Sequence, residues 1–253
     1  MTEEKKLGKA DLHIHSRAND GLATPREVLE YVEHHTDLDV IAITDHDEIQ
    51  GAFQARELAM KRNYRVQVMV GMEISTLNGH LLALDIHEPI RLLQSLEKTV
   101  AAVHRQGGLC IVPHPLSWLT PSVGQRAINR VMRKPSDEIY LDGIEILNPS
   151  YAGRVAYKKV IHLNETHWHL AACGGSDSHG LATVGSAHTL FPGHTIADLR
   201  QAILERTTQA GGSFWNFSDH YSIAAPQVFR SVIVTPGMRI KKAVTWLLEG
   251  QSR

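Results

Sequence analysis

Apolar runs of strand length alternate with helix-patterned segments along most of this chain, and no other feature restricts its possible folds as strongly. The runs cover residues 10–14, 40–44, 66–72, 81–86, 109–112, 143–147 and 170–173. Several runs are apolar at consecutive positions, which is typical of parallel strands that are covered on both faces. The alternation therefore predicts an α/β fold with a parallel sheet, either a barrel or a doubly wound sheet.

The helices between these runs have recognisable starts. Residues 24–27 read Thr-Pro-Arg-Glu, a capping box with proline at the first helical position. Asp47 and Gln50 are potential caps of the next helix, and Thr195 and Asp198 of a later one. A third helix is expected to end at the glycine pair 107–108. Its predicted apolar stripe is Leu92, Leu93, Leu96, Val100 and Val103.

No internal repeat or linker divides the chain, so we predict a single domain over residues 1–253. Residues 119–140 look irregular and carry Arg126, Arg130, Arg133 and Lys134, and we interpret them as a short insertion or lid beside a site. Residues 213–253 are interpreted as a C-terminal extension, with a potential strand at 228–235 and a helical apolar stripe at 238–248.

The composition excludes several classes of protein. Lysine plus arginine number 26 and aspartate plus glutamate 27, a net charge of −1, which argues against a broad surface for nucleic acid or an anionic membrane. Cys110 and Cys173 lie inside apolar runs, where we expect buried thiols rather than a disulfide. No stretch approaches the roughly 20 apolar residues of a membrane span, so we expect a cytoplasmic protein without membrane contact.

Histidine is unusually frequent, with 16 residues, and together with carboxylates it gathers where the apolar runs end. Because the carboxyl ends of parallel strands share one rim, these side chains are expected to meet there. His80 is the exception, since it begins its run. The candidates are His13, His15 and Asp20 after the first run, His46 after the second, Glu73 after the third, His80, His114 after the run at 109–112, and Asp177 and His179 after the last.

Histidine and carboxylate side chains in this arrangement predict a metal centre. His13 and His15 are two residues apart and therefore project from the same strand face. The candidates outnumber the ligands of one tetrahedral ion, so two or three divalent ions are implied, with Glu73 bridging a pair. Imidazole mixed with carboxylate suits zinc, manganese or iron better than calcium or magnesium.

The order of these motifs resembles that of the PHP (polymerase and histidinol phosphatase) family, and most closely its stand-alone TrpH/YciV-like phosphoesterases. The resemblance covers residues 10–206. It implies a distorted (β/α)7 TIM-like barrel, a trinuclear site and phosphoester hydrolysis. By the same resemblance, the first ion would take His13, His15, Glu73 and Asp177, the second Glu73, His80 and His114, and the third Asp20, His46 and His179.

The expected activity is hydrolysis of phosphate monoesters or diesters of a small molecule such as a nucleotide. A hydroxide activated by the ions would attack the phosphorus, so the protein need supply no nucleophile. Arg17 is the first candidate for a phosphate contact and Arg154 the second. Asp45 and Asp47 flank His46 and are candidates to orient ligand imidazoles from behind, with helix capping the alternative for Asp47.

Three other functions stay open at this point. Amidohydrolases also begin with a His-x-His pair, but they normally use a mid-barrel lysine and a single late aspartate. A metal-binding module without turnover is disfavoured by the intact ligands at every motif. A 5′–3′ exonuclease on short oligonucleotides would keep the chemistry, with a local groove near residues 126–134 for a short nucleic acid.

Overall fold

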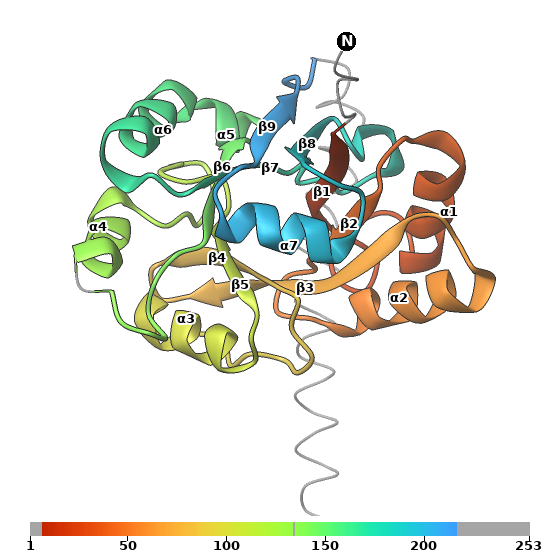
Figure 1. Cartoon of the computed structure of the whole chain (residues 1–253), viewed down its shortest axis with the longest axis horizontal. Helices are drawn as coiled ribbons and strands as arrows, with labels where there is room; N and C mark the ends of the chain where they lie inside the picture. The colour runs from red at the N-terminus through yellow and green to blue at the C-terminus, as the bar shows by residue number, and fades with distance from the viewer. Residues whose placement is uncertain (1–6, 134, 217–253) are drawn as a thin grey trace, which may run out of the picture.

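The computed structural model describes residues 7–133 and 135–216, and these form one sheet surrounded by helices (Figure 1). The potential strand at 228–235 and helix at 238–248 lie outside the described residues. The strand order is β7-β6-β5-β4-β3-β2-β1-β8-β9. The strands are β1 Gly8–Ile14, β2 Val40–Ile43, β3 Gln67–Thr76, β4 Gly79–Leu84, β5 Leu109–Val112, β6 Gly143–Leu147, β7 Ala171–Gly174, β8 Ala187–Phe191 and β9 Gln209–Gly212.

The helices connect successive strands and cover the outside of the sheet. Outside the barrel lie α1 Pro25–His35, α2 Gln50–Arg62, α3 Leu96–Arg105, α4 Gln125–Arg133, α5 Tyr151–Arg154, α6 Tyr157–Leu163, the π-helical turn η1 Asn164–Trp168 and the 3-10 turn η2 Leu181–Thr183. The last described helix, α7 Ile196–Leu204, lies instead across one end of the sheet (Figure 1).

The two sides of the sheet approach each other and nearly close a barrel. Thr189 in β8 donates its hydroxyl to the carbonyl of Gly174 in β7 at 2.9 Å and accepts the amide of Gly174 at 3.0 Å. Ile14 at the end of β1 forms a bridge with Ser178 after β7. The expected TIM-like barrel class is therefore confirmed, although the described sheet has 9 strands instead of the seven that the family resemblance implies.

Two strands, β4 and β8, differ from the prediction of a parallel sheet. β4 pairs antiparallel with both β3 and β5, and β8 pairs antiparallel with β1, whereas the pairs β1–β2, β2–β3, β5–β6 and β6–β7 are parallel. The prediction for residues 81–86 was wrong in direction because β3 does not end near residue 72. It continues to Thr76 and turns back as a hairpin at Gly79, whose φ of +119° favours glycine.

Two apolar clusters support this arrangement. The inner one fills the barrel with side chains such as Leu12, Met69 and Ile111. The helix α7 closes one end of the barrel with Leu199 and Ile203. The outer cluster packs the strands against the surrounding helices. Since α7 covers one end, the opposite end, where β1, β2 and β5–β7 finish, remains for the polar residues.

The helix boundaries confirm some expectations and correct others. Thr24 caps α1 and Thr195 caps α7, each in a capping box, as expected. Asp47 and Gln50 do not cap α2: the helix begins after Ile49 without a side-chain cap, because the Asp47 carboxylate is held by Ser75 of β3.

The third predicted helix is shorter than expected. Ser95 accepts the amide of Lys98 and starts α3 at Leu96, so Leu92 and Leu93 precede the helix and are exposed by 42% and 59% instead of being buried. The helix does end just before Gly107, whose φ is +77°.

Residues 119–140 contain a helix that packs in the core. In α4 the side chains of Ala127, Ile128 and Val131 are buried, and this helix connects β5 to β6. Cys110 and Cys173 are buried free thiols, as predicted. Within residues 7–133 and 135–216, no helix has the length and apolar character to cross a bilayer.

Candidate metal centre

The barrel end opposite α7 gathers all nine candidate ligands of the sequence. The direction of β4 explains why His80 lies here although it begins its strand. Because β4 is antiparallel to its neighbours, its beginning lies at the rim where the parallel strands end. The register of β1 to β2 shifts between Asp11 and Ile14, in the segment that carries His13. All nine are buried or half-buried: His13, His15, Asp20, His46, Glu73, His80, His114, Asp177 and His179.

Glu73 is the centre of the cluster. Three imidazole nitrogens surround its Oε2 atom: His13 Nε2 at 3.3 Å, His15 Nε2 at 3.3 Å and His46 Nδ1 at 3.1 Å. Two more lie at its Oε1 atom: His80 Nδ1 at 2.9 Å and His114 Nε2 at 3.0 Å. The two oxygens of this single carboxylate therefore face two different groups of imidazoles, which is the arrangement of a bridging ligand.

His13, His15 and Asp177 present three atoms that lie close enough together to share one cation. His13 Nε2 and His15 Nε2 are 3.1 Å apart, and they lie 3.6 Å and 3.4 Å from Asp177 Oδ1. Each of the two nitrogens also lies 3.3 Å from Glu73 Oε2. Ligand atoms bound to a cation at about 2.0–2.2 Å in a tetrahedron are about 3.3–3.6 Å from one another. The spacings of His13, His15 and Asp177 are thus close to those of three ligands of a single divalent ion.

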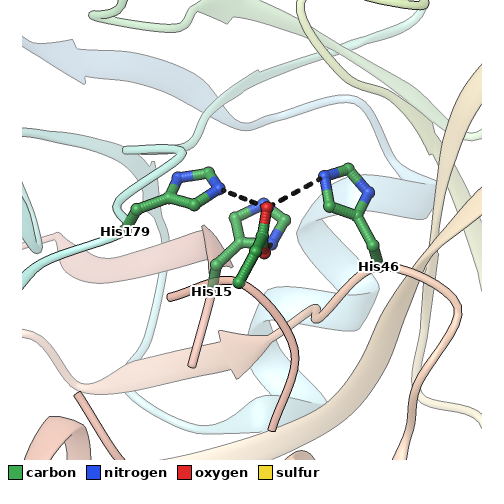
Figure 2. Close-up of side chains that lie close together, drawn as sticks. His15, His46 and His179 are labelled. Atoms are coloured by element: carbon green, nitrogen blue, oxygen red, sulfur yellow. Dashed lines mark ion pairs between the residues drawn. The ribbon is translucent and has the colours of Figure 1, made fainter. Parts of the chain in front are cut away.

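A second group surrounds Asp20 on the other side of His15. Asp20 Oδ2 lies 3.3 Å from His179 Nε2 and 3.9 Å from His46 Nε2, and Asp20 Oδ1 lies 3.6 Å from His15 Nδ1. Figure 2 shows the three imidazoles turned toward one another, with the ion pairs of His46 and His179 drawn as dashed lines. The rings of His15 and His179 are stacked, with centroids 4.1 Å apart.

Buried nitrogen atoms without hydrogen bonds indicate that cations fit this site. His15 Nδ1, His80 Nδ1 and His179 Nε2 are buried and make no hydrogen bond within the described residues. Each nevertheless has a carboxylate oxygen at 2.9–3.6 Å, close enough for both atoms to bind the same cation. Buried polar atoms are costly unless they are paired or coordinated. The donor set therefore suits two or three divalent ions of the zinc or manganese type.

The electrostatics of the cluster lead to the same conclusion. Burial lowers the pKa of His13, but the charges of Asp177, Glu145 and Glu73 outweigh burial and hold that pKa well above its ordinary value. The same balance raises the pKa of His15 to about 10. Burial raises the pKa of Glu73, but the surrounding imidazoles reverse this and hold it well below its ordinary range. The carboxylates thus create a strongly negative, buried site that attracts cations.

Two of the candidate ligands have an unusual backbone. The φ angles of His114 and Asp177 are +29° and +51°, in the left-handed region that non-glycine residues seldom adopt. Such conformations cost free energy and are found mainly at functional sites, where the surrounding structure holds them.

Aspartate–serine pairs connect the loops that carry the ligands. Asp45 accepts the amide and the hydroxyl of Ser16, each at 2.6 Å, and Asp47 accepts those of Ser75 at 2.7 Å and 2.8 Å. Each serine neighbours a candidate ligand, since Ser16 follows His15 and Ser75 lies two residues after Glu73. Asp45 and Asp47 therefore hold the backbone next to His15 and Glu73. We had expected them to bond directly to a ligand imidazole instead.

Sequence reasoning missed Glu145 and Asn148. Glu145 Oε1 accepts His13 Nδ1 at 2.8 Å, and its Oε2 accepts the backbone amide of His114 at 2.7 Å. Asn148 donates to Glu145 Oε2 at 3.1 Å and to Asp177 Oδ2 at 3.2 Å. A signal was present, because Glu145 is the single charged residue in the apolar strand Gly143–Leu147.

The two arginines proposed for phosphate binding lie in the segments that follow β1 and β6. Arg17 is exposed and its Nε donates to the carbonyl of Leu22 at 3.1 Å, within its own loop. Arg154, in α5, lies over the ring of Phe214, with 4.8 Å between its Cζ and the ring centroid. Their role toward a substrate stays a prediction.

Comparison with known proteins identifies the family. The family profile described as PHP domain matches residues 11–171, and the one described as PHP-associated matches residues 165–208. A protein of Methanocaldococcus jannaschii is 32% identical over 168 residues, which is 60% of this chain and 91% of that protein.

Enzymes with named activities match over shorter stretches. A 5′-3′ exoribonuclease of Haemophilus influenzae is 40% identical over 68 residues, 27% of this chain and 24% of the enzyme. A 3′,5′-nucleoside bisphosphate phosphatase of Chromobacterium violaceum is 33% identical over 84 residues, 32% of this chain and 28% of the enzyme. The chain thus matches about a quarter of the length of these two relatives.

A solved structure shares the fold. A two-domain protein of Bacteroides vulgatus that contains a predicted PHP-like metal-dependent phosphoesterase superposes with a TM-score of 0.63 at 20% identity, covering 82% of this chain and 65% of that one. Because the PHP profile covers more than half of the chain and the motifs meet in one cluster, the chain belongs to the PHP (polymerase and histidinol phosphatase) domain family and is by class a metal-dependent phosphoesterase.

Proposed function

We propose that the metal centre hydrolyses phosphate monoesters or diesters of a small molecule, with a nucleotide as the first candidate. The observation that carries the proposal is the position of Glu73, whose two oxygens face two separate groups of imidazoles. This is the geometry expected of a carboxylate shared by two cations. Paired cations are well suited to a phosphate ester, because its negative charge repels an incoming nucleophile.

The candidate ligands would hold three divalent ions in three groups. His13, His15, Glu73 and Asp177 would hold one divalent ion, Glu73 with His80 and His114 a second, and Asp20 with His46 and His179 a third. When bound, such ions neutralise phosphate charge and lower the pKa of a water molecule toward 7. The apolar inner cluster below the centre excludes bulk water from beneath the ligands, which strengthens their electrostatic interactions.

Contacts to the substrate are proposed for the loops above the centre. Arg17 follows the His13–His15 pair and could form two parallel hydrogen bonds to a phosphate after leaving the Leu22 carbonyl. Arg154 would be a second cation on the neighbouring rim. The small phosphorylated substrate is supported by the bisphosphate phosphatase activity named for the Chromobacterium violaceum relative.

The second candidate is 5′–3′ exonuclease action on short oligonucleotides. It is supported by the name of the Haemophilus influenzae relative, whose matching stretch is 40% identical. The net charge of −1 favours the small substrate over a long nucleic acid, because each phosphate contact of a long strand requires its own cationic partner. The two candidates differ in how the rate depends on oligonucleotide length.

The test combines metal analysis with a substrate panel. Purified protein, treated with chelator and then reloaded with manganese or zinc, is assayed on mononucleotides, bisnucleotides, sugar phosphates, short oligonucleotides, amides and lactones. His13→Ala is expected to lose metal and to lower turnover by orders of magnitude. The control His104→Gln also removes a buried imidazole, but one outside the centre, and should keep both. Full turnover and full metal content in His13→Ala, or turnover of amides alone, would contradict the proposal.

A further inference from the structure

We propose that Glu145 and Asn148 form a positioning pair that sets how tightly the ion of His13, His15, Glu73 and Asp177 is held. Neither residue is one of the proposed ligands, and the inference rests on the proposed function. β6 positions both residues: Glu145 lies within the strand, and Asn148 is the first residue after it. They are buried, with 2% exposure each.

Glu145 fixes the ring of His13. The bond from His13 Nδ1 to Glu145 Oε1, at 2.8 Å, places the ring proton on Nδ1 and directs the Nε2 lone pair to the side of Glu73 and Asp177. A ligand imidazole whose distal nitrogen donates to a carboxylate has a fixed tautomer and a fixed ring orientation, and it is a better electron donor. Glu145 thus prepares His13 for a cation without contacting the cation.

The other oxygen of Glu145 holds the backbone just after β5. Glu145 Oε2 accepts the amide of His114 at 2.7 Å, where the backbone has its left-handed φ of +29°. Because it accepts hydrogen bonds from His13 in β1 and from His114 just after β5, the carboxylate connects these two segments to β6. A substitution of Glu145 should therefore change the orientation of the His13 ring directly and the position of His114 through its backbone.

Asn148 extends this control to Asp177. Its Oδ1 accepts the amide of Ser150 at 3.2 Å and the hydroxyl of Ser150 at 2.6 Å. Because the amide of Ser150 can only donate, Oδ1 must face it, and the NH2 group must face the carboxylates. That group donates to Glu145 Oε2 at 3.1 Å and to Asp177 Oδ2 at 3.2 Å. The hydrogen bond leaves Asp177 Oδ1 directed toward His13 and His15.

Removing the pair should weaken one ion more than the others. Loss of a partner behind a metal ligand typically lowers metal affinity 10–100-fold. In Asn148→Leu the donors are lost while the bulk is kept, and in Asn148→Asp the shape is kept but a carboxylate is placed beside Glu145 and Asp177. In Glu145→Gln, an NH2 group must face either the His13 N–H or the two N–H donors at Oε2.

The experiment is a metal titration of chelator-treated full-length protein. Manganese binding is followed by calorimetry, and Co²⁺ is used for its absorption spectrum, which reports ligand geometry. The matched control is Asp142→Asn: Asp142 is also a buried carboxylate bonded to an imidazole, that of His104 at 2.9 Å, but it lies just before β6 and outside the nine-ligand cluster. We expect one site to weaken 10–100-fold in the Asn148 and Glu145 variants, with an altered Co²⁺ spectrum, and no change in Asp142→Asn.

Further outcomes separate this inference from the proposed function. Phosphatase turnover in the Asn148 variants should be restored by saturating manganese, since their ligands are intact. Unchanged manganese affinities and Co²⁺ spectra in folded Asn148 variants would overturn the inference but leave the proposed function standing. Equal weakening in Asp142→Asn would also overturn it, because general destabilisation would then explain the effect. Absence of metal binding in the wild-type protein would overturn both.

Discussion

Gly175 lies directly against Glu145, with no room for a side chain between them. A Cβ atom at residue 175 would overlap Glu145 Oε1 and would lie 2.7 Å from the Cβ of His13. The backbone after β7 thus packs on the carboxylate that orients His13, and only glycine permits this approach. We predict that Gly175→Ala displaces Glu145, lowers stability by about 1–3 kcal/mol, as overpacking does, and weakens manganese binding.

Urea unfolding with and without manganese measures both effects. The control is Gly124→Ala, because a Cβ atom at that glycine meets no atom within 4 Å. It should leave the affinity for manganese unchanged. If Gly175→Ala binds manganese as tightly as the wild type does, the Glu145 carboxylate does not need its observed position.

The alternation of apolar runs predicted an α/β fold with a parallel sheet, the family resemblance implied the barrel, and the ends of the runs predicted where the candidate ligands meet. Carboxyl ends of parallel strands share a rim, so residues that follow apolar runs, such as His46 and His114, could be assigned to that rim without coordinates. His80 could not be assigned in this way. The direction of β4 depends on the hairpin at Gly79, and an apolar run has the same appearance in either direction.

The supporting contacts were beyond sequence reasoning for a different reason. The bond between His13 and Glu145 joins residues 132 positions apart, so the charge of Glu145 in an apolar strand marks the residue but not its partner. Asp47 had two plausible local roles, but its carboxylate bonds to Ser75, 28 positions away. Local patterns predict where a side chain is placed along a strand, whereas its partner depends on the packing of strands that are distant in sequence.

The His104–Asp142 pair should make stability depend on pH. Burial lowers the pKa of His104, but hydrogen bonds to the Asp142 carboxylate and the Glu138 carbonyl outweigh it, so the pKa is raised above its ordinary value of 6.5. Both ring nitrogens face acceptors, at 2.9 Å each, which favours the charged imidazolium. A group whose pKa is raised by folding stabilises fully below its unfolded pKa and loses this contribution as pH rises through the folded pKa.

We therefore predict that His104→Gln costs more stability at pH 6 than at pH 9. Hydrogen bonds to charged groups contribute about 1.5–3 kcal/mol, so the difference in unfolding free energy from the wild type should be of this order at pH 6. At pH 9 it should shrink without vanishing, since a neutral imidazole can still donate one hydrogen bond. Chemical denaturation at the two pH values measures this. A difference that grows toward pH 9 would contradict the predicted sign.

Arg17→Ala tests the proposed phosphate contact. If the guanidinium binds the phosphate of the substrate equally in the ground state and the transition state, the substitution should raise KM about tenfold or more and leave kcat close to that of the wild type. Arg26→Ala is the control, because Arg26 is an exposed arginine that pairs with Glu30 in α1. Steady-state kinetics on the best substrate of the panel gives the answer. Equal KM values for the two variants would show that Arg17 does not contact the substrate and serves only to bond within its own loop.

Metal binding should also be visible as thermal stabilisation, because the centre joins β1, β3, β4 and the segment after β5 through His13, Glu73, His80 and His114. A ligand that binds only the folded state at 100 times its dissociation constant adds about 2.7 kcal/mol to stability. We predict that chelator lowers the Tm of the wild type by several degrees and that manganese restores it. In Glu73→Gln the shift should be much smaller, because the bridging carboxylate is lost while the fold keeps its apolar clusters. A calorimetric scan in which Glu73→Gln responds to manganese as fully as the wild type would show that the ions bind elsewhere.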